Sequence, residues 1–163
     1  MIDSARRGVF APLSKKQEPK PIRPPYVLDW GLFDQVCPNC QEKPCATFCE
    51  EAIIVMDDLG IPRISFKEAG CTFCEACATS CPNGVLGLEG RAQIFAKIWI
   101  DTAKCLAWNG TMCFTCKDFC DSNAIEFFGL YRPVIHDNCT ACGLCNSPCP
   151  ADAIAIRGGK DAL

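Results

Sequence analysis

The sequence predicts an α+β fold built from two similar modules in tandem, each made of short hairpins and short helices, behind an extended N-terminal tail. Three observations carry this prediction. The 16 cysteines of the 163 residues fall into four repeats of one pattern, short apolar segments lie between the repeats, and the start of the chain is rich in proline and basic residues. We expect the tail over residues 1–33, the first module over residues 34–92 and the second module over residues 93–163.

The tail combines positive charge with proline. Residues 1–25 carry six basic and two acidic side chains, although the whole chain has a net charge of −3. Such a segment is expected to be extended, and three interpretations are open: a solvated leader, an arm that docks on a partner, or a segment that folds back on the acidic body. Residues 4–10 resemble a twin-arginine export signal, but the apolar stretch that such a signal needs does not follow. We therefore expect a cytoplasmic protein, in which thiols stay reduced.

All 16 cysteines belong to four runs of four, which we call quartets. They are Cys37, Cys40, Cys45 and Cys49; Cys71, Cys74, Cys77 and Cys81; Cys105, Cys113, Cys116 and Cys120; and Cys139, Cys142, Cys145 and Cys149. Such a density of cysteine is compatible with a disulfide scaffold, zinc sites or iron–sulfur clusters. The second and fourth quartets read C-x2-C-x2-C-x3-C-P, which is the ligand run of bacterial ferredoxins.

The spacing of this run suits a cubane cluster. Three thiolates on a tightly turning loop can reach three irons of one cluster, and the fourth reaches the cluster of a partner repeat. Structural zinc sites instead pair two separated C-x2-C knuckles, and disulfides need an oxidising compartment. Because every quartet keeps four thiols, we expect four [4Fe-4S] clusters with all 16 cysteines as ligands. Cluster binding would supply much of the folding free energy, so the cluster-free chain is expected to be largely unstructured.

The first and third quartets depart from the regular spacing. Four residues separate Cys40 from Cys45, seven separate Cys105 from Cys113, and neither quartet is followed by proline. A longer loop can still close on the same cluster at a modest entropic cost. We expect it to leave the cluster more exposed or more labile.

Three pairs of short apolar segments flank turn or linking residues, as in the dicluster ferredoxin plan of one small hairpin beside each cluster loop. They are residues 52–57 with 62–66, residues 84–88 with 97–101, and residues 124–128 with 133–137. A helix of one or two turns is expected after the last cysteine of each quartet. Pro82 and Pro150 suit the first turn of such a helix.

A small residue after each quartet indicates how the quartets pair. Ala52 and Gly84 come three positions after the last cysteine of the first two quartets, whereas Ala124 and Ala153 come four positions after that of the last two. This register favours pairing the first quartet with the second and the third with the fourth, so that paired quartets exchange their last cysteines. A nested pairing of the first quartet with the fourth remains open.

The chain resembles the NapF-type ferredoxins over nearly its whole length. The specific features are DSARRGVF over residues 3–10, IRPPY over residues 22–26, and the stretched third quartet with CLAWNGTMC over residues 105–113. The wider first quartet departs from the family pattern. The resemblance implies a cytoplasmic iron–sulfur protein that acts with the molybdenum-containing catalytic subunit of a periplasmic nitrate reductase before that subunit is exported.

Two tasks follow from this resemblance: assembly of the partner's iron–sulfur cluster, or supply of electrons to it. We expect an accessory protein in maturation of the immature catalytic subunit, with a single-electron relay to a partner oxidoreductase as the alternative. The chain has no flavin or dinucleotide fingerprint, so we do not expect an enzyme. Its net charge of −3 argues against nucleic-acid binding. The chain contains no run of 18 apolar residues, so we expect no transmembrane helix.

Overall fold

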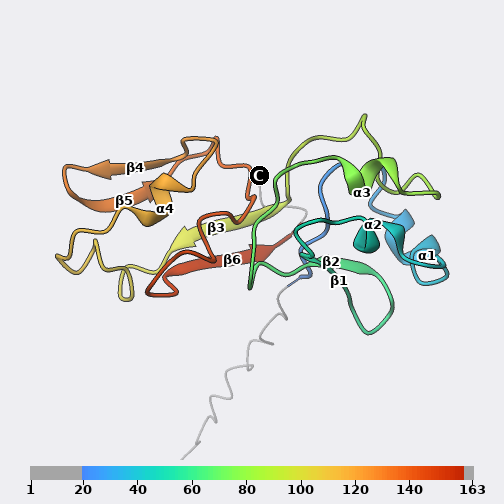
Figure 1. Cartoon of the computed structure of the whole chain (residues 1–163), viewed down its shortest axis with the longest axis horizontal. Helices are drawn as coiled ribbons and strands as arrows, with labels where there is room; N and C mark the ends of the chain where they lie inside the picture. Colours follow the sequence, from blue (N-terminus) through green and yellow to red (C-terminus); the bar gives the residue numbers. More distant parts are fainter. Residues whose placement is uncertain (1–19, 160–163) are drawn as a thin grey trace, which may run out of the picture.

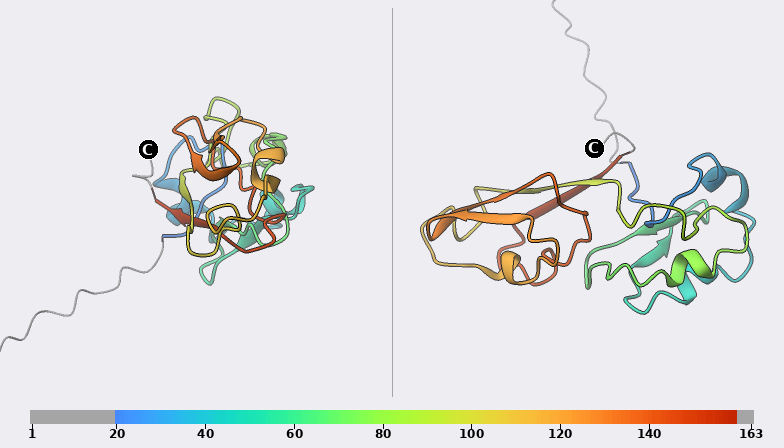
Figure 2. Two further views of the ribbon diagram at one scale, coloured as in Figure 1. Left: turned by 90° about the vertical axis from the view of Figure 1, so that its left-hand side faces the viewer. Right: turned by 90° about the horizontal axis from the view of Figure 1, so that it is seen from above.

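The computed structural model of the chain describes residues 20–159. Two halves lie end to end along its long axis (Figure 1 and Figure 2), the first of residues 20–92 and the second of residues 93–159. The helices are α1 (Leu32–Val36), α2 (Pro44–Thr47), α3 (Ala76–Thr79) and α4 (Thr115–Asp118). The strands are β1 (Ile54–Met56), β2 (Pro62–Ile64), β3 (Ala96–Ile100), β4 (Ile125–Phe128), β5 (Tyr131–Ile135) and β6 (Ile154–Gly158). Within residues 20–159, no helix has the length and apolar character needed to cross a bilayer.

Three two-stranded antiparallel sheets make up the regular β-structure of the described residues. β1 pairs with β2, and β4 pairs with β5, as the turn signals between them predicted. In the first hairpin the Asp57 carboxylate accepts hydrogen bonds from the amides of Leu59 (3.1 Å) and Ile61 (2.9 Å). Gly60 supplies the positive φ of 73° that this turn requires. Two of the three expected hairpins therefore form.

The expected pairing of residues 84–88 with residues 97–101 is wrong. β3 pairs along its whole length with β6, and Leu86 forms a single β-bridge with Val27 instead. The alternation of isoleucine and alanine over residues 153–156 was the signal for β6 in the sequence. Because β3 opens the second half and β6 ends it, their pairing closes that half on itself.

The short helices precede the last cysteine of a quartet, which corrects the expectation that they follow it. α2, α3 and α4 each contain the third cysteine of their quartet and end before the fourth. Three residues after each fourth cysteine the backbone is left-handed, with φ of 51° at Ala52, 64° at Gly84, 50° at Asn123 and 45° at Asp152. A left-handed residue ends a helix and redirects the chain into the next strand, so Pro82 and Pro150 start none. All four quartets thus have a left-handed residue at the same position after the fourth cysteine, although the small residue stands three positions after it in two quartets and four positions after it in the other two.

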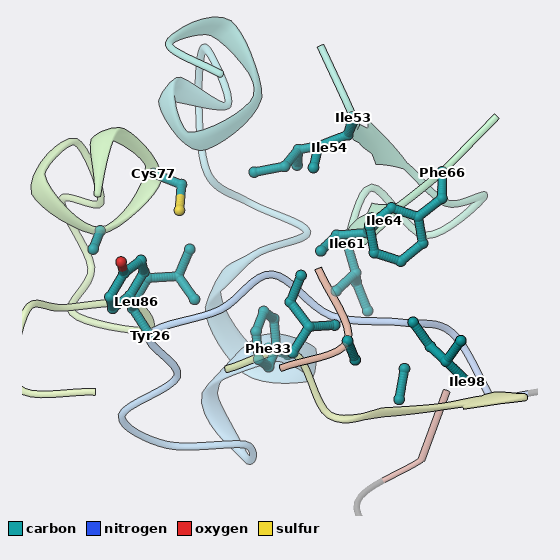
Figure 3. Close-up of a cluster of buried hydrophobic side chains, with 14 of the residues drawn as sticks. Tyr26, Phe33, Ile53, Ile54, Ile61, Ile64, Phe66, Cys77, Leu86 and Ile98 are labelled. Carbon is teal, nitrogen blue, oxygen red and sulfur yellow. The ribbon is translucent and has the colours of Figure 1, made fainter. Parts of the chain in front are cut away.

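Residues 20–33 pack against the first half, which corrects the expectation of an extended tail for this segment. Tyr26 and Phe33 are only 3% and 2% exposed, and they lie in one apolar cluster with Ile64 and Leu86 (Figure 3). The two prolines before Tyr26 are also buried, which costs no unsatisfied N–H because proline has no amide donor. The first module is therefore larger at its N-terminal side than the sequence indicated.

An ion pair anchors this segment to the β1–β2 turn. The Arg23 guanidinium donates to the Asp57 carboxylate (3.2 Å) and to the Pro62 carbonyl (2.9 Å), and it lies 5.4 Å from the centre of the Phe33 ring. Burial alone would raise the pKa of Asp57, but hydrogen bonds from the Ile61 amide and from Arg23 outweigh it and lower that pKa. Of the three interpretations of the tail, folding back on the body describes residues 20–33. The twin-arginine motif and the rest of the tail lie outside the described residues.

Candidate metal centres

Three hollows of about 360 Å³ are each lined by four cysteines. The cysteines are Cys37, Cys40, Cys45 and Cys81 at the first hollow, Cys49, Cys71, Cys74 and Cys77 at the second, and Cys105, Cys113, Cys116 and Cys149 at the third. Apolar side chains supply much of the remaining wall, such as Phe33 at the first, Ile54 at the second and Ile100 at the third. Each hollow thus joins three cysteines of one quartet with the last cysteine of another.

A fourth group of thiols forms from Cys120, Cys139, Cys142 and Cys145. Burial raises the pKa of the Cys145 thiol to about 12, and the nearby thiols of Cys142, Cys139, Cys116 and Cys120 add to this shift. Burial also raises the pKa of Cys139, and the thiols of Cys142 and Cys120 again contribute. The Asn138 side chain also donates to the Ser122 carbonyl (2.9 Å), which joins the residue before Cys139 to the segment just after Cys120. We therefore assign Cys120 to this fourth set.

We call these sets the first, second, third and fourth groups, after the quartet that supplies three of their thiols. The last cysteines are exchanged within two pairs of quartets: Cys81 lies in the first group, Cys49 in the second, Cys149 in the third and Cys120 in the fourth. A nested pairing of the first quartet with the fourth would bring Cys149 to the first hollow, but Cys149 lines the third. The lining of the hollows thus joins the first quartet to the second and the fourth quartet to the third, and the binding of one cluster by each group stays a prediction.

The chemistry of the hollows fits an iron–sulfur cluster. Each hollow is lined by four cysteines, and four thiolates are the ligand set of a [4Fe-4S] cluster. Within the part of the chain that the structure describes, no three His, Cys, Asp or Glu side chains are close enough to hold a single metal ion. A core of several irons and sulfides is large enough, and it takes thiolate ligands.

The thiols resist ionisation without a metal. Burial raises the pKa of Cys45 and Cys116 to about 11 and that of Cys77 to about 12, and neighbouring thiols add to each shift. A free thiol has a pKa of about 8.5. These groups are therefore protonated at pH 7 until a cationic centre replaces the proton, and metal binding must release protons.

Backbone amides point at several of the sulfurs. The Ala124 amide donates to Cys120 Sγ (3.2 Å), and the Ala153 amide donates to Cys149 Sγ (3.3 Å). The left-handed residue just before each alanine directs the amide toward the sulfur. Hydrogen bonds to ligand sulfur stabilise thiolate charge and help to set the potential of a cluster. Sequence reasoning missed this role, although the alanine four positions after each of these cysteines was a visible signal.

A second residue that sequence reasoning missed is Tyr26. It lines the second hollow, and its hydroxyl donates to the Phe73 carbonyl at 2.8 Å. Burial raises the pKa of Tyr26 to about 12, with Glu75 and the thiols of the second group adding to the shift. The residue has a positive φ of 64°, a conformation that nothing in the sequence IRPPY indicates. Tyr26 ties the N-terminal segment to the wall of the second hollow.

The longer loop of the first quartet is held in place by Lys43. Its ammonium donates to three backbone carbonyls, those of Cys37, Pro38 and Gly60. Glu42 and Lys43 both have positive φ, of 60° and 45°. Cys37 is buried, whereas the most exposed cysteine of this half is Cys74 of the regular second quartet. The cysteines of the first quartet are therefore no more exposed than those of the second, and a more labile cluster in the first group stays a prediction.

The longer loop of the third quartet is also pinned. The Asn109 side chain donates to three carbonyls, those of Thr102, Ala103 and Cys105. The Trp108 indole donates to the Pro133 carbonyl at 3.1 Å. All four cysteines of this quartet are nevertheless half-buried, whereas Cys142 and Cys145 of the fourth quartet are buried. Greater exposure does accompany the irregular spacing here.

Curated relatives match this chain along most of its length. The ferredoxin-type protein NapF of Escherichia coli (strain K12) is 34% identical over 161 residues, which cover 96% of both chains. NapF of Haemophilus influenzae is 34% identical over 164 residues, covering 94% of this chain and 92% of its own. The ferredoxin-type protein NapG of Escherichia coli (strain K12) is 26% identical, covering 83% of this chain and 69% of its own. No protein-family model matches the chain. The identity to NapF proteins along nearly the full length confirms the resemblance: the chain belongs to the NapF family of ferredoxin-type proteins.

Proposed function

We propose that the chain binds four [4Fe-4S] clusters, one in each cysteine group, as two tandem dicluster modules over residues 20–92 and 93–163. The observation that supports this best is the set of three hollows, each lined by four cysteines from two quartets. When bound, such clusters supply one-electron transfer. The chain itself holds them through thiolates, excludes water with apolar walls and donates amide hydrogen bonds to the sulfurs.

The role that this geometry supports best is the carriage of single electrons, which we place in the cytoplasm as a proposal. The first and second groups exchange their last cysteines, and the third group takes Cys149 from the fourth quartet, so neighbouring groups lie side by side. Clusters in neighbouring groups could exchange electrons in short steps. Membership of the NapF family supports the molybdenum-containing catalytic subunit of a nitrate reductase as the partner. In this role the chain is a carrier rather than an enzyme.

A second candidate role is assembly of the iron–sulfur cluster on the immature catalytic subunit. The third quartet favours it, because all four of its cysteines are half-buried. Beside them Trp108 is 37% exposed and Met112 is 64% exposed. These exposed side chains offer a protein that accepts iron and sulfide an apolar surface beside the third group.

One experiment separates the two roles. The protein is loaded with iron-57 without oxygen, reduced, and mixed with a catalytic subunit that lacks its cluster and with one that already holds it. Electron carriage predicts that the loaded subunit becomes reduced while iron-57 stays with this chain. The variant Cys113→Ser should abolish the transfer, whereas Thr111→Ser, an exposed residue of the same loop, should not. Movement of iron-57 into the cluster-free subunit, without reduction of the loaded one, would contradict electron carriage and establish assembly.

A further inference from the structure

The loops of the second and fourth quartets touch each other where the two halves meet. The Cys71 amide donates to the Cys142 carbonyl at 2.7 Å. A second bond runs from the Asn146 side chain to the Phe66 carbonyl, also at 2.7 Å, and joins residues 80 positions apart in the chain. Cluster-binding loops thus take part in the contact between the halves, together with the β-bridge of Lys20 with Gly158 and the edge-on packing of Trp30 on Phe95.

Two glycines allow these loops to approach so closely. A Cβ atom on Gly70 would lie 2.4 Å from the Leu144 amide nitrogen, and one on Gly143 would lie 2.4 Å from the Phe66 ring. Gly70 directly precedes Cys71, and Gly143 directly follows Cys142. Any side chain at Gly70 would meet backbone atoms, which cannot move aside as a flexible side chain can. The absence of both side chains therefore permits the close approach of the second and fourth quartet loops.

The four groups follow each other in a spatial order that differs from their order in the sequence. The hydrogen bond from Cys71 to Cys142 places the second group beside the fourth. The first and second groups exchange their last cysteines, Cys81 and Cys49, so these two groups are neighbours. Cys149 of the fourth quartet joins the third group, so the third group is a neighbour of the fourth. In Figure 1, α2 of the first quartet and α4 of the third lie on opposite sides of the middle.

We propose that the Cys71–Cys142 contact is the junction through which electrons pass between the halves, so that the clusters act in the order first, second, fourth, third. The proposal rests on the four-cluster assignment above and deepens it. One electron leaves the reduced cluster of the second group and reduces the oxidised cluster of the fourth, or the reverse, and no bond forms or breaks. The two irregular quartets, at the ends of this row, are where one-electron donors and acceptors of the protein kind would meet the chain.

The order is tested by electron paramagnetic resonance on variants that keep two clusters. Cys40→Ser with Cys113→Ser should leave the second and fourth clusters, whereas Cys74→Ser with Cys142→Ser should leave the first and third. After reduction with dithionite, the first variant should show spectra broadened by interaction between two reduced clusters, and the second variant should lose that interaction. An interaction that is present only between the first and third clusters would overturn the proposal.

A pair of single substitutions decides the matter if those variants fail to hold their clusters. Asn146→Asp removes the donor to the Phe66 carbonyl and should weaken the interaction between the reduced second and fourth clusters. Asn138→Asp is the matched control, because its amide donates to the Ser122 carbonyl (2.9 Å) within the second half, and it should leave the spectrum unchanged. Equal effects of the two substitutions would contradict the junction.

The iron and sulfide contents of the protein distinguish a failure of the proposed function from a failure of the proposed cluster order. A chain that binds no clusters would contradict the proposed function. A chain that binds its clusters but lacks the interaction between the second and fourth would contradict only the order.

Discussion

Oxidative removal of iron from the anaerobically purified protein is expected to unfold the chain almost completely. Its three described sheets have two strands each, and an isolated two-stranded hairpin is marginal in water. The hollows between them are walled by apolar side chains and buried thiols. A structural metal site can contribute on the order of 10 kcal/mol, which is comparable to the whole stability of about 5–15 kcal/mol of a typical domain. Circular dichroism and amide hydrogen exchange would measure the loss.

The pH dependence of this transition has a defined sign. Without clusters, the folded form holds its buried thiols at raised pKa, about 12 for Cys77 and Cys145. Whatever fold remains is therefore most stable below the free-thiol pKa of about 8.5 and loses stability as the pH rises toward 12. Cluster binding has the opposite dependence because it requires thiolates, so reloading should be more complete at pH 9 than at pH 7. A chelated chain that keeps protected amides in β3 and β6 would contradict the account.

Combining cysteine substitutions across quartets is expected to reveal which thiols share a cluster. Cys81→Ser alone should remove one cluster, the one in the first group, although Cys81 belongs to the second quartet in sequence. Adding Cys45→Ser, in the same group, should remove no further iron. Adding Cys77→Ser instead should remove a second cluster, about four more irons. The comparison is a double-mutant cycle in which non-additivity identifies shared sites, and iron per chain is the measurement.

The neighbouring Ser80 offers a control for that series. Its hydroxyl is buried without a hydrogen-bond partner, so Ser80→Ala should leave the iron content unchanged and cost no stability. If Cys81→Ser with Cys45→Ser removed two clusters, while Cys81→Ser with Cys77→Ser removed only one, the exchange of last cysteines would be wrong. The first and second quartets would then each keep their own fourth thiol.

Much of the fold was readable where local chemistry decides it. The β1–β2 turn carries Asp57 and Gly60 at the positions that the turn needs, and both are ordinary turn signals. The pairing of β6 was missed because its partner β3 lies more than fifty residues earlier in the chain. No short turn joins the two strands, so no local turn signal indicates that they pair. The packing of residues 20–33 was missed because charge and proline indicate an extended segment, whereas Tyr26 and Phe33 bury it.

The candidate site, too, has features that could be predicted from the sequence and features that could not. Cysteine spacing identified all the thiols that the structure brings together, because ligand geometry is local to each loop. The bonds that hold the longer loops could not be read, since Lys43 has a left-handed backbone that is rare for a residue of its type. The contact of Cys71 with Cys142 could not be predicted from the sequence either, because a glycine indicates a close approach without identifying the residue on the other side.

The most direct test of the central claim is the analysis of iron, acid-labile sulfide and zinc in protein purified without oxygen. The account predicts about sixteen irons and as many sulfides per chain, from four clusters of four irons each, and a brown colour that bleaches on reduction. A folded, colourless chain that carries zinc without sulfide would contradict it.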